Sequence, residues 1–200
     1  MRLNYKLLLP LIILISGISS CTVLDQAKQA GNLSKCEFRL ESVQHLNLAG
    51  INVQNVEQLS DLSMADAGKL LSFYSAEKFP LKFTLNIEAK NPNTTPAGLS
   101  KLDWKLLIDG VEMTQGILDK AFSIPANNAT AVIPLQVNID LKEALSGKSA
   151  DAVINFALNL AGVGNKPTRF TMKLKPTISV NGFPIDYPGY INVNTEFSSK

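Results

Sequence analysis

Histidine and cysteine are scarce in this chain of 200 residues, which has one histidine, His45, and two cysteines, Cys21 and Cys36. A Ser-His-Asp or Cys-His catalytic arrangement could be built only on His45, and no G-x-S-x-G motif accompanies it. One histidine and one spare cysteine are too few ligands for a typical zinc site. The composition therefore predicts a protein that is not an enzyme and holds no metal or other cofactor. His45 is expected to be a surface or hydrogen-bonded structural residue.

Other motifs of site chemistry are also missing. The acidic residues lack the D-x-D-x-D-G spacing of a calcium loop. Gly162-Val163-Gly164 has neither a phosphate-loop lysine at the right spacing nor the strand and helix of a dinucleotide fold around it. A glycosidase could bring a carboxylate pair such as Asp103 and Asp109 together, but both lie in the polar row of an alternating pattern. We therefore interpret them as outward-facing surface residues.

Neither sign of charge dominates the chain. It has 19 basic and 17 acidic residues, and Arg2 and Lys6 lie in a leader segment described next. Without those two, 17 basic residues face 17 acidic ones, and no run of lysine and arginine remains that could follow a phosphate backbone. The charge pattern predicts that nucleic acid is not a partner.

The first twenty residues have the layout of a secretory signal peptide. Arg2 and Lys6 form a basic start, an apolar run follows, and small residues precede Cys21. The sequence Ile18-Ser19-Ser20-Cys21 resembles the lipobox of bacterial lipoproteins, in which the signal is cut before the cysteine and that cysteine is acylated. The resemblance implies attachment to a membrane through lipidated Cys21, and Thr22 after the cysteine implies the outer membrane, facing the periplasm. The alternative is an uncleaved start with an incidental cysteine.

The remaining chain is predicted to hold one domain. Residues 1–20 are the signal peptide, residues 21–35 are the lipid anchor and a polar tether, and residues 36–200 are a single folded domain. With Cys21 lipidated, Cys36 has no partner for an internal disulfide. Cys36 opens an inward row with Phe38, Leu40 and Ser42 that alternates with polar residues, so we expect a small core residue rather than a reactive thiol.

Two alternating strands around the middle of the chain carry the fold prediction. Residues 81–89 place five apolar side chains on one face, and Asn91-Pro92-Asn93 should then stop the pairing. Residues 102–108 repeat the alternation, and Asp109-Gly110 supplies the two residues that a type I′ hairpin turn requires. Residues 111–120 should pair back on the Trp104 strand, with Gly116 as a bulge.

Further strands and helices are expected on both sides of this centre. Strands are predicted at residues 36–42 and 46–53, with Ala49-Gly50 as a bulge in the second. Later strands are predicted at 131–141, as an edge strand or a bulged one because of Pro134, and at 170–175, followed by a hairpin turn at Asn181-Gly182. Ser63 and Asp66 form a capping box for a helix ending near residue 77, and residues 141–160 follow a helical pattern broken near Ser146-Gly147. The predicted fold class is mainly β, an antiparallel β-sandwich of the fibronectin type III or immunoglobulin kind, with one or two added helices.

An ordered series of motifs between residues 81 and 141 resembles the late embryogenesis abundant type 2 family, also called the water stress and hypersensitive response domain. The series is Asn91-Pro92-Asn93, Leu102-Asp103-Trp104-Lys105-Leu106, Asp109-Gly110, Gly116, Ile124-Pro125-Ala126 and Ala131-Val132-Ile133-Pro134-Leu135. The resemblance implies a folded β-sandwich that protects proteins or membranes under water stress by binding, without catalytic residues. The lipobox, the second helical segment and the late hairpin depart from the family's simplest form.

Three functions fit these observations. The leading hypothesis is a non-enzymatic envelope lipoprotein of the stress-protective type, with protein or lipid clients. The second is a carrier of lipid or another apolar ligand, because the amphipathic pattern at residues 141–160 could cover an opening beside the aliphatic strands. The third is a structural or adhesion subunit of the cell envelope that assembles through the edge strand at residues 131–140.

Overall fold

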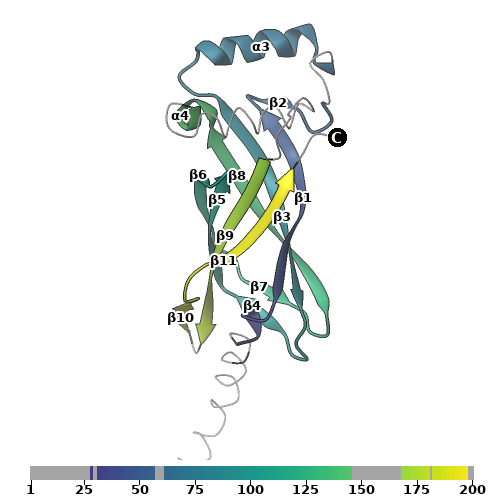
Figure 1. The fold of residues 1–200 in the computed structure, drawn as a ribbon, viewed down its shortest axis with the longest axis vertical. Helices are drawn as coiled ribbons and strands as arrows, with labels where there is room; N and C mark the ends of the chain where they lie inside the picture. The colour runs from purple at the N-terminus through teal and green to yellow at the C-terminus, as the bar shows by residue number, and fades with distance from the viewer. Residues whose placement is uncertain (1–27, 29–30, 57–60, 146–167, 181, 198–200) are drawn as a thin grey trace, which may run out of the picture.

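The computed structural model describes residues 28, 31–56, 61–145, 168–180 and 182–197 of the chain. Figure 1 shows two larger sheets packed face to face, a small third sheet at one end, and the helix α3 (Met64–Ser75) across the other end. All strand pairs are antiparallel. The mainly β, antiparallel sandwich predicted from the sequence is therefore confirmed.

The first sheet has the strand order β2-β1-β3-β8. Its strands are β1 (Glu37–Leu48), β2 (Ile51–Asn52), β3 (Pro80–Asn91) and β8 (Ala129–Asp140). β3 pairs with β8 without interruption, from Pro80 opposite Asp140 to Asn91 opposite Ala129. The strand predicted at residues 81–89 is therefore an inner strand of this sheet, with β1 on one side and β8 on the other. Within the described part of the chain, β8 is an edge strand, as Pro134 indicated. The sequence also suggested that copies or partners assemble through this edge, and that stays a prediction.

The second sheet has the order β10-β9-β5-β6, and β11 also pairs with β9. Its strands are β5 (Lys101–Ile108), β6 (Val111–Leu118), β9 (Thr168–Val180), β10 (Phe183–Asp186) and β11 (Ile191–Phe197). Asp109 and Gly110 have φ angles of 48° and 82°, so they form the hairpin turn predicted between β5 and β6. Val180 pairs with Phe183 across the second predicted turn, which confirms the late hairpin.

The core lies between the two sheets and draws on both. Fully buried side chains come from β3, β5, β8 and β9; they include Leu85, Ile87, Leu102, Leu106, Ile133, Leu135, Met172 and Leu174. Every second residue of β5 is buried, which is the alternation expected of a strand with one covered face. Removing one such aliphatic side chain from water contributes roughly 1.5–3 kcal/mol before the loss of chain entropy is counted.

The helix α3 starts as its capping box predicted. The Ser63 hydroxyl oxygen accepts a hydrogen bond from the Asp66 backbone N–H at 3.0 Å, and the same hydroxyl lies 2.7 Å from an Asp66 carboxylate oxygen. The first of these contacts satisfies one of the backbone donors that the first helical turn leaves without partners. The helix α4 (Leu141–Leu145) begins the second predicted helical segment, and residues 146–160 of that prediction lie outside the described residues.

The segment Ala49-Gly50 is a tight turn rather than the predicted bulge. Leu48 pairs with Ile51, and Ala49 and Gly50 have φ angles of 51° and 83°, which is the geometry of a two-residue hairpin loop. The Gly50 N–H donates to the Asn47 side-chain oxygen at 2.8 Å. This side-chain contact stabilises a left-handed alanine that residue preferences alone do not favour.

Gly116 does not form the predicted bulge either. It lies directly opposite Trp104, and a Cβ atom at position 116 would be 2.4 Å from Cζ2 of the indole. Glycine is therefore required because the ring of Trp104 occupies the place of a side chain. The bulge of this strand pair lies at Met113, between the pairs Leu106–Thr114 and Leu107–Glu112.

The inward row predicted for the first strand is correct up to Leu40. Glu41 is an extra residue in β1, since Leu40 pairs with Ile87 while Ser42 pairs with Asn86. The bulge turns Ser42 to the outer face, where its hydroxyl accepts a hydrogen bond from the Asn86 side-chain amide at 2.9 Å. The expectation that Ser42 points inward was therefore wrong.

Candidate functional site

The end of the sandwich opposite α3 is organised by Asn91, which is fully buried. Its side-chain amide donates to the backbone oxygens of Thr95 at 3.0 Å and Ile124 at 3.1 Å, and its side-chain oxygen accepts from the Asn93 N–H. These bonds connect the end of β3 to the small sheet of β4 (Ala97–Leu99) and β7 (Phe122–Ile124). The predicted stop at Asn91-Pro92-Asn93 is confirmed, and it also fixes the position of β4.

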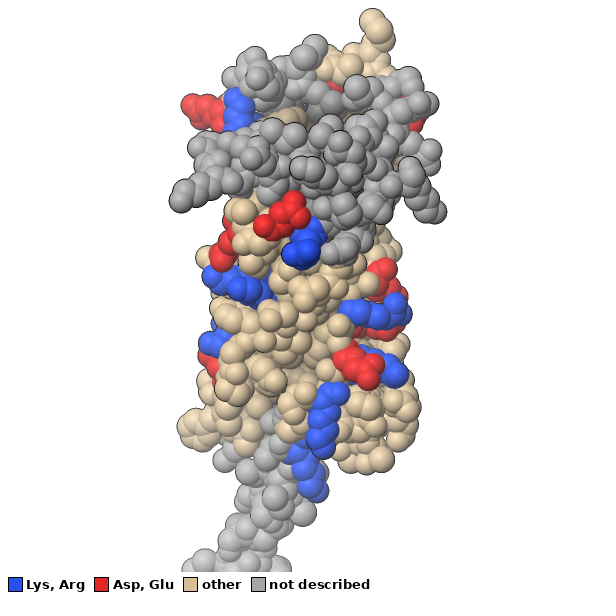
Figure 2. Space-filling view, viewed as in Figure 1, with Lys and Arg blue, Asp and Glu red and all other residues tan. Residues whose placement is uncertain are grey.

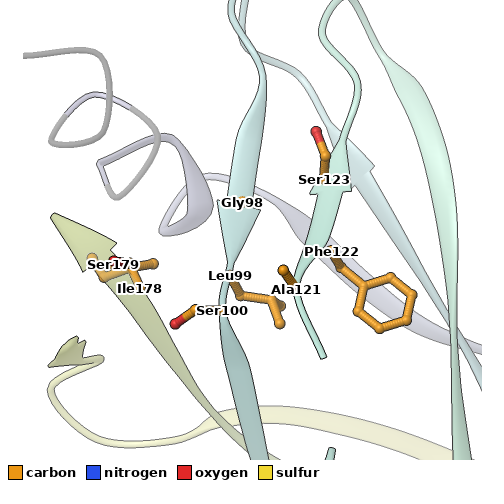
Figure 3. A pocket seen from close by; sticks show the side chains of 8 residues that line it. All are labelled: Gly98, Leu99, Ser100, Ala121, Phe122, Ser123, Ile178 and Ser179. Carbon is orange, nitrogen blue, oxygen red and sulfur yellow. The ribbon is translucent and has the colours of Figure 1, made fainter. Parts of the chain in front are cut away.

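A groove of about 380 Å³ lies between this small sheet and the end of β9. It is lined by Gly98, Leu99, Ser100, Ala121, Phe122, Ser123, Ile178 and Ser179. Figure 3 shows Ile178 and Ser179 on one side of β4, with Ser123 and the ring of Phe122 on the other. Ser100 connects the two walls, because its N–H and its hydroxyl both donate to the Thr177 backbone oxygen at 2.7 and 3.0 Å.

The chemistry of the groove is that of a binding surface. None of its eight lining residues is ionisable, and its hydrogen-bonding side chains are serine hydroxyls. Lys120 stands at the rim, with its ammonium nitrogen 5.4 Å from the centre of the Phe122 ring. Such a lining suits an apolar or neutral group, with one cation available beside it.

Cys21, the predicted site of lipid attachment, lies outside the described residues. Cys36 is half-buried and packs against the core, and its thiol donates to the Asn32 backbone oxygen at 3.5 Å. Burial raises the pKa of the Cys36 thiol to about 11. The group is therefore a neutral thiol at physiological pH, which agrees with the predicted packing role.

His45 is exposed and lies in a bulge of β1 with a φ angle of 56°. Its Nδ1 atom is 3.3 Å from the Thr84 hydroxyl, which is also 3.3 Å from the side-chain oxygen of Gln136. His45 is thus a hydrogen-bonded surface residue, as predicted. Thr84 belongs to the polar row of β3, but its cross-strand neighbours Gln44 and Gln136 help to leave it only 5% exposed.

Asp103 and Asp109 are not brought together. They are six residues apart on one extended segment, which corresponds to about 20 Å at the usual rise of a strand. Asp103 pairs with Lys101 at 3.0 Å, and an Asp109 carboxylate oxygen accepts the Arg169 backbone N–H at 2.9 Å. Both acids have structural partners of their own, and the geometry does not make them a glycosidase pair.

The charged side chains on the outer faces of the sheets form neighbouring pairs. Arg39 contacts both carboxylate oxygens of Glu88 at 2.6 and 3.0 Å, and Lys105 contacts Glu112 at 2.9 Å. The hydrogen bond and charge of Arg39 lower the pKa of Glu88. Figure 2 shows basic and acidic residues side by side over the described face rather than a field of one sign.

Among the described residues there is neither a candidate metal cluster nor a candidate membrane-spanning helix. Within them, no group of three or more histidine, cysteine or acidic residues could hold a metal ion. No helix among them is long and apolar enough to cross a membrane. The Gly162-Val163-Gly164 segment weighed earlier lies outside the described residues.

The groove is the feature that sequence patterns did not reveal. Leu99, Phe122 and Ile178 come from three strands far apart in the chain, and no spacing rule connects them. The available signal was the short run Ala97–Leu99 after the proline-rich turn, which is too brief to be recognised as a strand.

The chain matches a known protein family over part of its length. A family model described as late embryogenesis abundant protein matches residues 86–190, from within β3 to the residue before β11. The curated proteins contain no significant match.

The chain is also similar to three solved structures. A solution structure of an Arabidopsis thaliana protein is 12% identical with a TM-score of 0.45, covering 81% of this chain and 80% of the other. A crystal structure of an Archaeoglobus fulgidus protein is 12% identical with a TM-score of 0.38, covering 62% and 89%. A solution structure of a late embryogenesis abundant protein is 11% identical with a TM-score of 0.37, covering 99% and 90%. Because the family model matches just over half of the residues of this chain, the chain belongs to the late embryogenesis abundant type 2 family and is a stress-related protein of that type.

Proposed function

We propose that this protein is a non-enzymatic stress-protective protein that acts by binding its clients. The observation that carries the proposal is the family match over residues 86–190, since the family is generally non-enzymatic. The groove between β4, β7 and β9 supports a binding role, because its uncharged lining can hold an apolar group without any reacting side chain. Clients are taken to be partly dehydrated proteins or lipids that expose apolar surface.

The protective role is tested by drying or freeze-thaw of a labile enzyme in the presence of the protein. We expect more activity to be recovered than with an equal mass of albumin. Equal recovery with albumin would contradict the proposal.

A pair of variants tests whether the groove takes part. Ala121→Asp places a charge in the groove, and Ala65→Asp places the same charge at an exposed position in the first turn of α3. Protection should fall for Ala121→Asp and stay unchanged for Ala65→Asp, because a buried contact with an apolar client cannot tolerate an unpaired charge. Equal protection by both variants would remove the groove from the mechanism.

The proposed location is the bacterial cell envelope, with the protein anchored by acylated Cys21 in the outer membrane and facing the periplasm. The support is the lipobox-like Ile18-Ser19-Ser20-Cys21 after a signal-like leader. More than one acyl chain on a cysteine gives a lasting anchor, at about 0.8 kcal/mol per buried methylene.

Anchoring is tested by expressing the full chain in a bacterium with two membranes and feeding labelled palmitate. The label should enter the native protein and not Cys21→Ala, while Cys36→Ala should be labelled normally. Two results would contradict attachment at Cys21. One is label on Cys21→Ala as well as on Cys36→Ala, and the other is no label on the native chain or on either variant. Separation of inner and outer membranes then tests the sorting.

A second candidate function is the transport of an apolar ligand, favoured by the position of Leu99, Phe122 and Ile178 around one open groove. The protein purified under native conditions should then carry lipid detectable by mass spectrometry. Ala121→Asp should lose that lipid. Purified protein without any bound lipid would contradict the carrier function.

A further inference from the structure

β9 and its partner β10 continue past the end of the neighbouring strand β5. Along the covered part, Phe170, Met172 and Leu174 are buried against the core. β5 begins at Lys101, opposite Thr177, whereas β9 runs on to Val180. The last residues of β9 and all of β10 therefore form a hairpin that extends beyond β5.

This hairpin carries apolar residues on its inner side. Ile178 pairs with Ile185 and Val180 pairs with Phe183, and paired residues of neighbouring strands point to the same face. Phe183 is 70% exposed and Ile185 is 47% exposed. We call these four side chains the hairpin patch, and it is an apolar surface that continues from the Ile178 wall of the groove.

Polar groups of the hairpin lie on its other face. Asp186 is the one acid of β10; its carboxylate accepts a hydrogen bond from the Thr177 hydroxyl at 2.7 Å and lies 3.4 Å from the Lys175 ammonium. The hairpin patch is therefore uncharged. An occupant that matches it is apolar as well, and its binding should depend little on salt.

The tether leaves the domain at the same end of the molecule. The Asn32 side-chain amide donates to the Thr95 hydroxyl at 2.6 Å and the Pro96 backbone oxygen at 3.1 Å, just before β4 enters the wall of the groove. Figure 1 shows the start of β1, β4, β7 and β10 together at this end and α3 at the opposite end. Asn32 lies eleven positions after Cys21, so a fully extended tether spans at most about 40 Å.

We propose that the hairpin patch is a membrane-contact surface, which lays Phe183 and Ile185 into the lipid headgroup layer beside the anchor. This inference rests on the proposed attachment through Cys21, which would hold this end of the domain within reach of the bilayer. Aromatic and aliphatic side chains at this depth contribute apolar burial without a charge having to leave water. The domain then stands on the membrane with α3 away from it, and the groove lies at the end of the domain that meets the membrane.

The depth of the hairpin can be measured on a chain that is tethered artificially. The chain from residue 21 to residue 200 retains every described element; carrying Cys36→Ala, it is coupled through the Cys21 thiol to a maleimide lipid in phosphatidylcholine vesicles. Phe183→Trp then reports contact with lipids brominated on their acyl chains. Met64→Trp is the matched control, because Met64 is 94% exposed on α3 at the opposite end. The native Trp104 is buried and gives both variants the same background.

We expect vesicles to quench the emission of the Phe183→Trp variant and to shift it to shorter wavelength, while the emission of the Met64→Trp variant stays unchanged. Equal quenching at both positions, or none at position 183, would overturn the proposal. Because the tether is synthetic, that result is independent of acylation in cells. Absence of palmitate at Cys21 would instead remove the proposed anchor.

A second measurement uses the same chain with Cys21→Ser and no tether. The double variant Phe183→Ser/Ile185→Ser should sediment with vesicles on the order of tenfold more weakly than the parent, since each side chain loses part of its apolar transfer energy. Met64→Ser should sediment with vesicles as strongly as the parent does. High salt should not change the vesicle binding of the parent or of Met64→Ser. If the parent instead forms a dimer without vesicles and the double variant is a monomer, the hairpin patch is a self-association surface and the membrane proposal fails.

Discussion

One apolar row on the inner face of the second sheet has a buried half in β9 and an exposed half in β10. Phe170, Met172 and Leu174 of β9 lie under the first sheet and are buried, whereas Phe183 and Ile185 continue the same inner face and are exposed. Their residue types are alike, since both halves consist of aromatic and aliphatic side chains at every second position. What differs is the presence of an opposing layer. An alternating pattern therefore identifies a face, and the tertiary structure decides whether that face supports folding or meets a partner.

The largest effect is expected from the covered half. Leu174→Ala should lower the free energy of unfolding by about 2–5 kcal/mol, because it leaves a cavity among side chains that cannot close around it. Ile185→Ala, in the uncovered half, should cost much less. Urea denaturation followed by Trp104 fluorescence measures both, and equal losses would break the distinction between the two halves.

A smaller loss should follow from filling the space beside Trp104. Gly116→Ala places a Cβ atom 2.4 Å from one ring carbon and 2.7 Å from another, so the ring or the strand must move. We expect a loss of about 1–3 kcal/mol, as is usual when a packed core receives an extra group. Gly68→Ala is the control: nothing lies within 4 Å of that position in α3, and alanine should stabilise the helix slightly. A Gly116→Ala protein as stable as the parent would show that Trp104 moves freely.

Local residue preferences predict some turns of this fold correctly and miss others. The turn at Asp109-Gly110 was predicted correctly because both residues tolerate positive φ. The turn at Ala49-Gly50 was missed because it depends on a contact from Asn47, which a local preference does not encode. Gly116 was interpreted as a bulge, since an interior glycine signals either a bulge or a close neighbour and only the cross-strand register identifies Trp104.

The candidate site was less predictable than the fold for a similar reason. Strand alternation follows from neighbouring residues, so the core faces of β3, β5 and β8 could be recognised directly. The groove joins Leu99, Phe122 and Ile178, whose proximity depends on how three strands end. Exposure of Phe183 depends on whether an opposing layer reaches the hairpin of β9 and β10, which the sequence of neither strand encodes.

Acid should weaken the hairpin through Asp186. The hydrogen bond from Thr177, together with the nearby Lys175 ammonium, lowers the pKa of Asp186 below its ordinary value. A carboxyl with a lowered pKa stabilises the fold above its unfolded pKa, about 4, and that contribution disappears as the pH falls through the lower folded value. The unfolding free energy of the parent should thus exceed that of Asp186→Ala at pH 7, by less than the two losses above, and the difference should shrink below pH 4. A difference that is constant with pH would rule out a contribution from ionisation.

The smallest effect on stability should come from the exposed half of the row. Phe183→Ser should change the free energy of unfolding by no more than about 0.5 kcal/mol, because its side chain remains largely in water in the folded domain. The same variant should reduce vesicle binding, so stability and binding would respond to different halves of one apolar face. If Phe183→Ser instead destabilises the protein as much as Leu174→Ala does, then residue 183 belongs to the folding core in solution, and the uncovered half of the row would have no separate role.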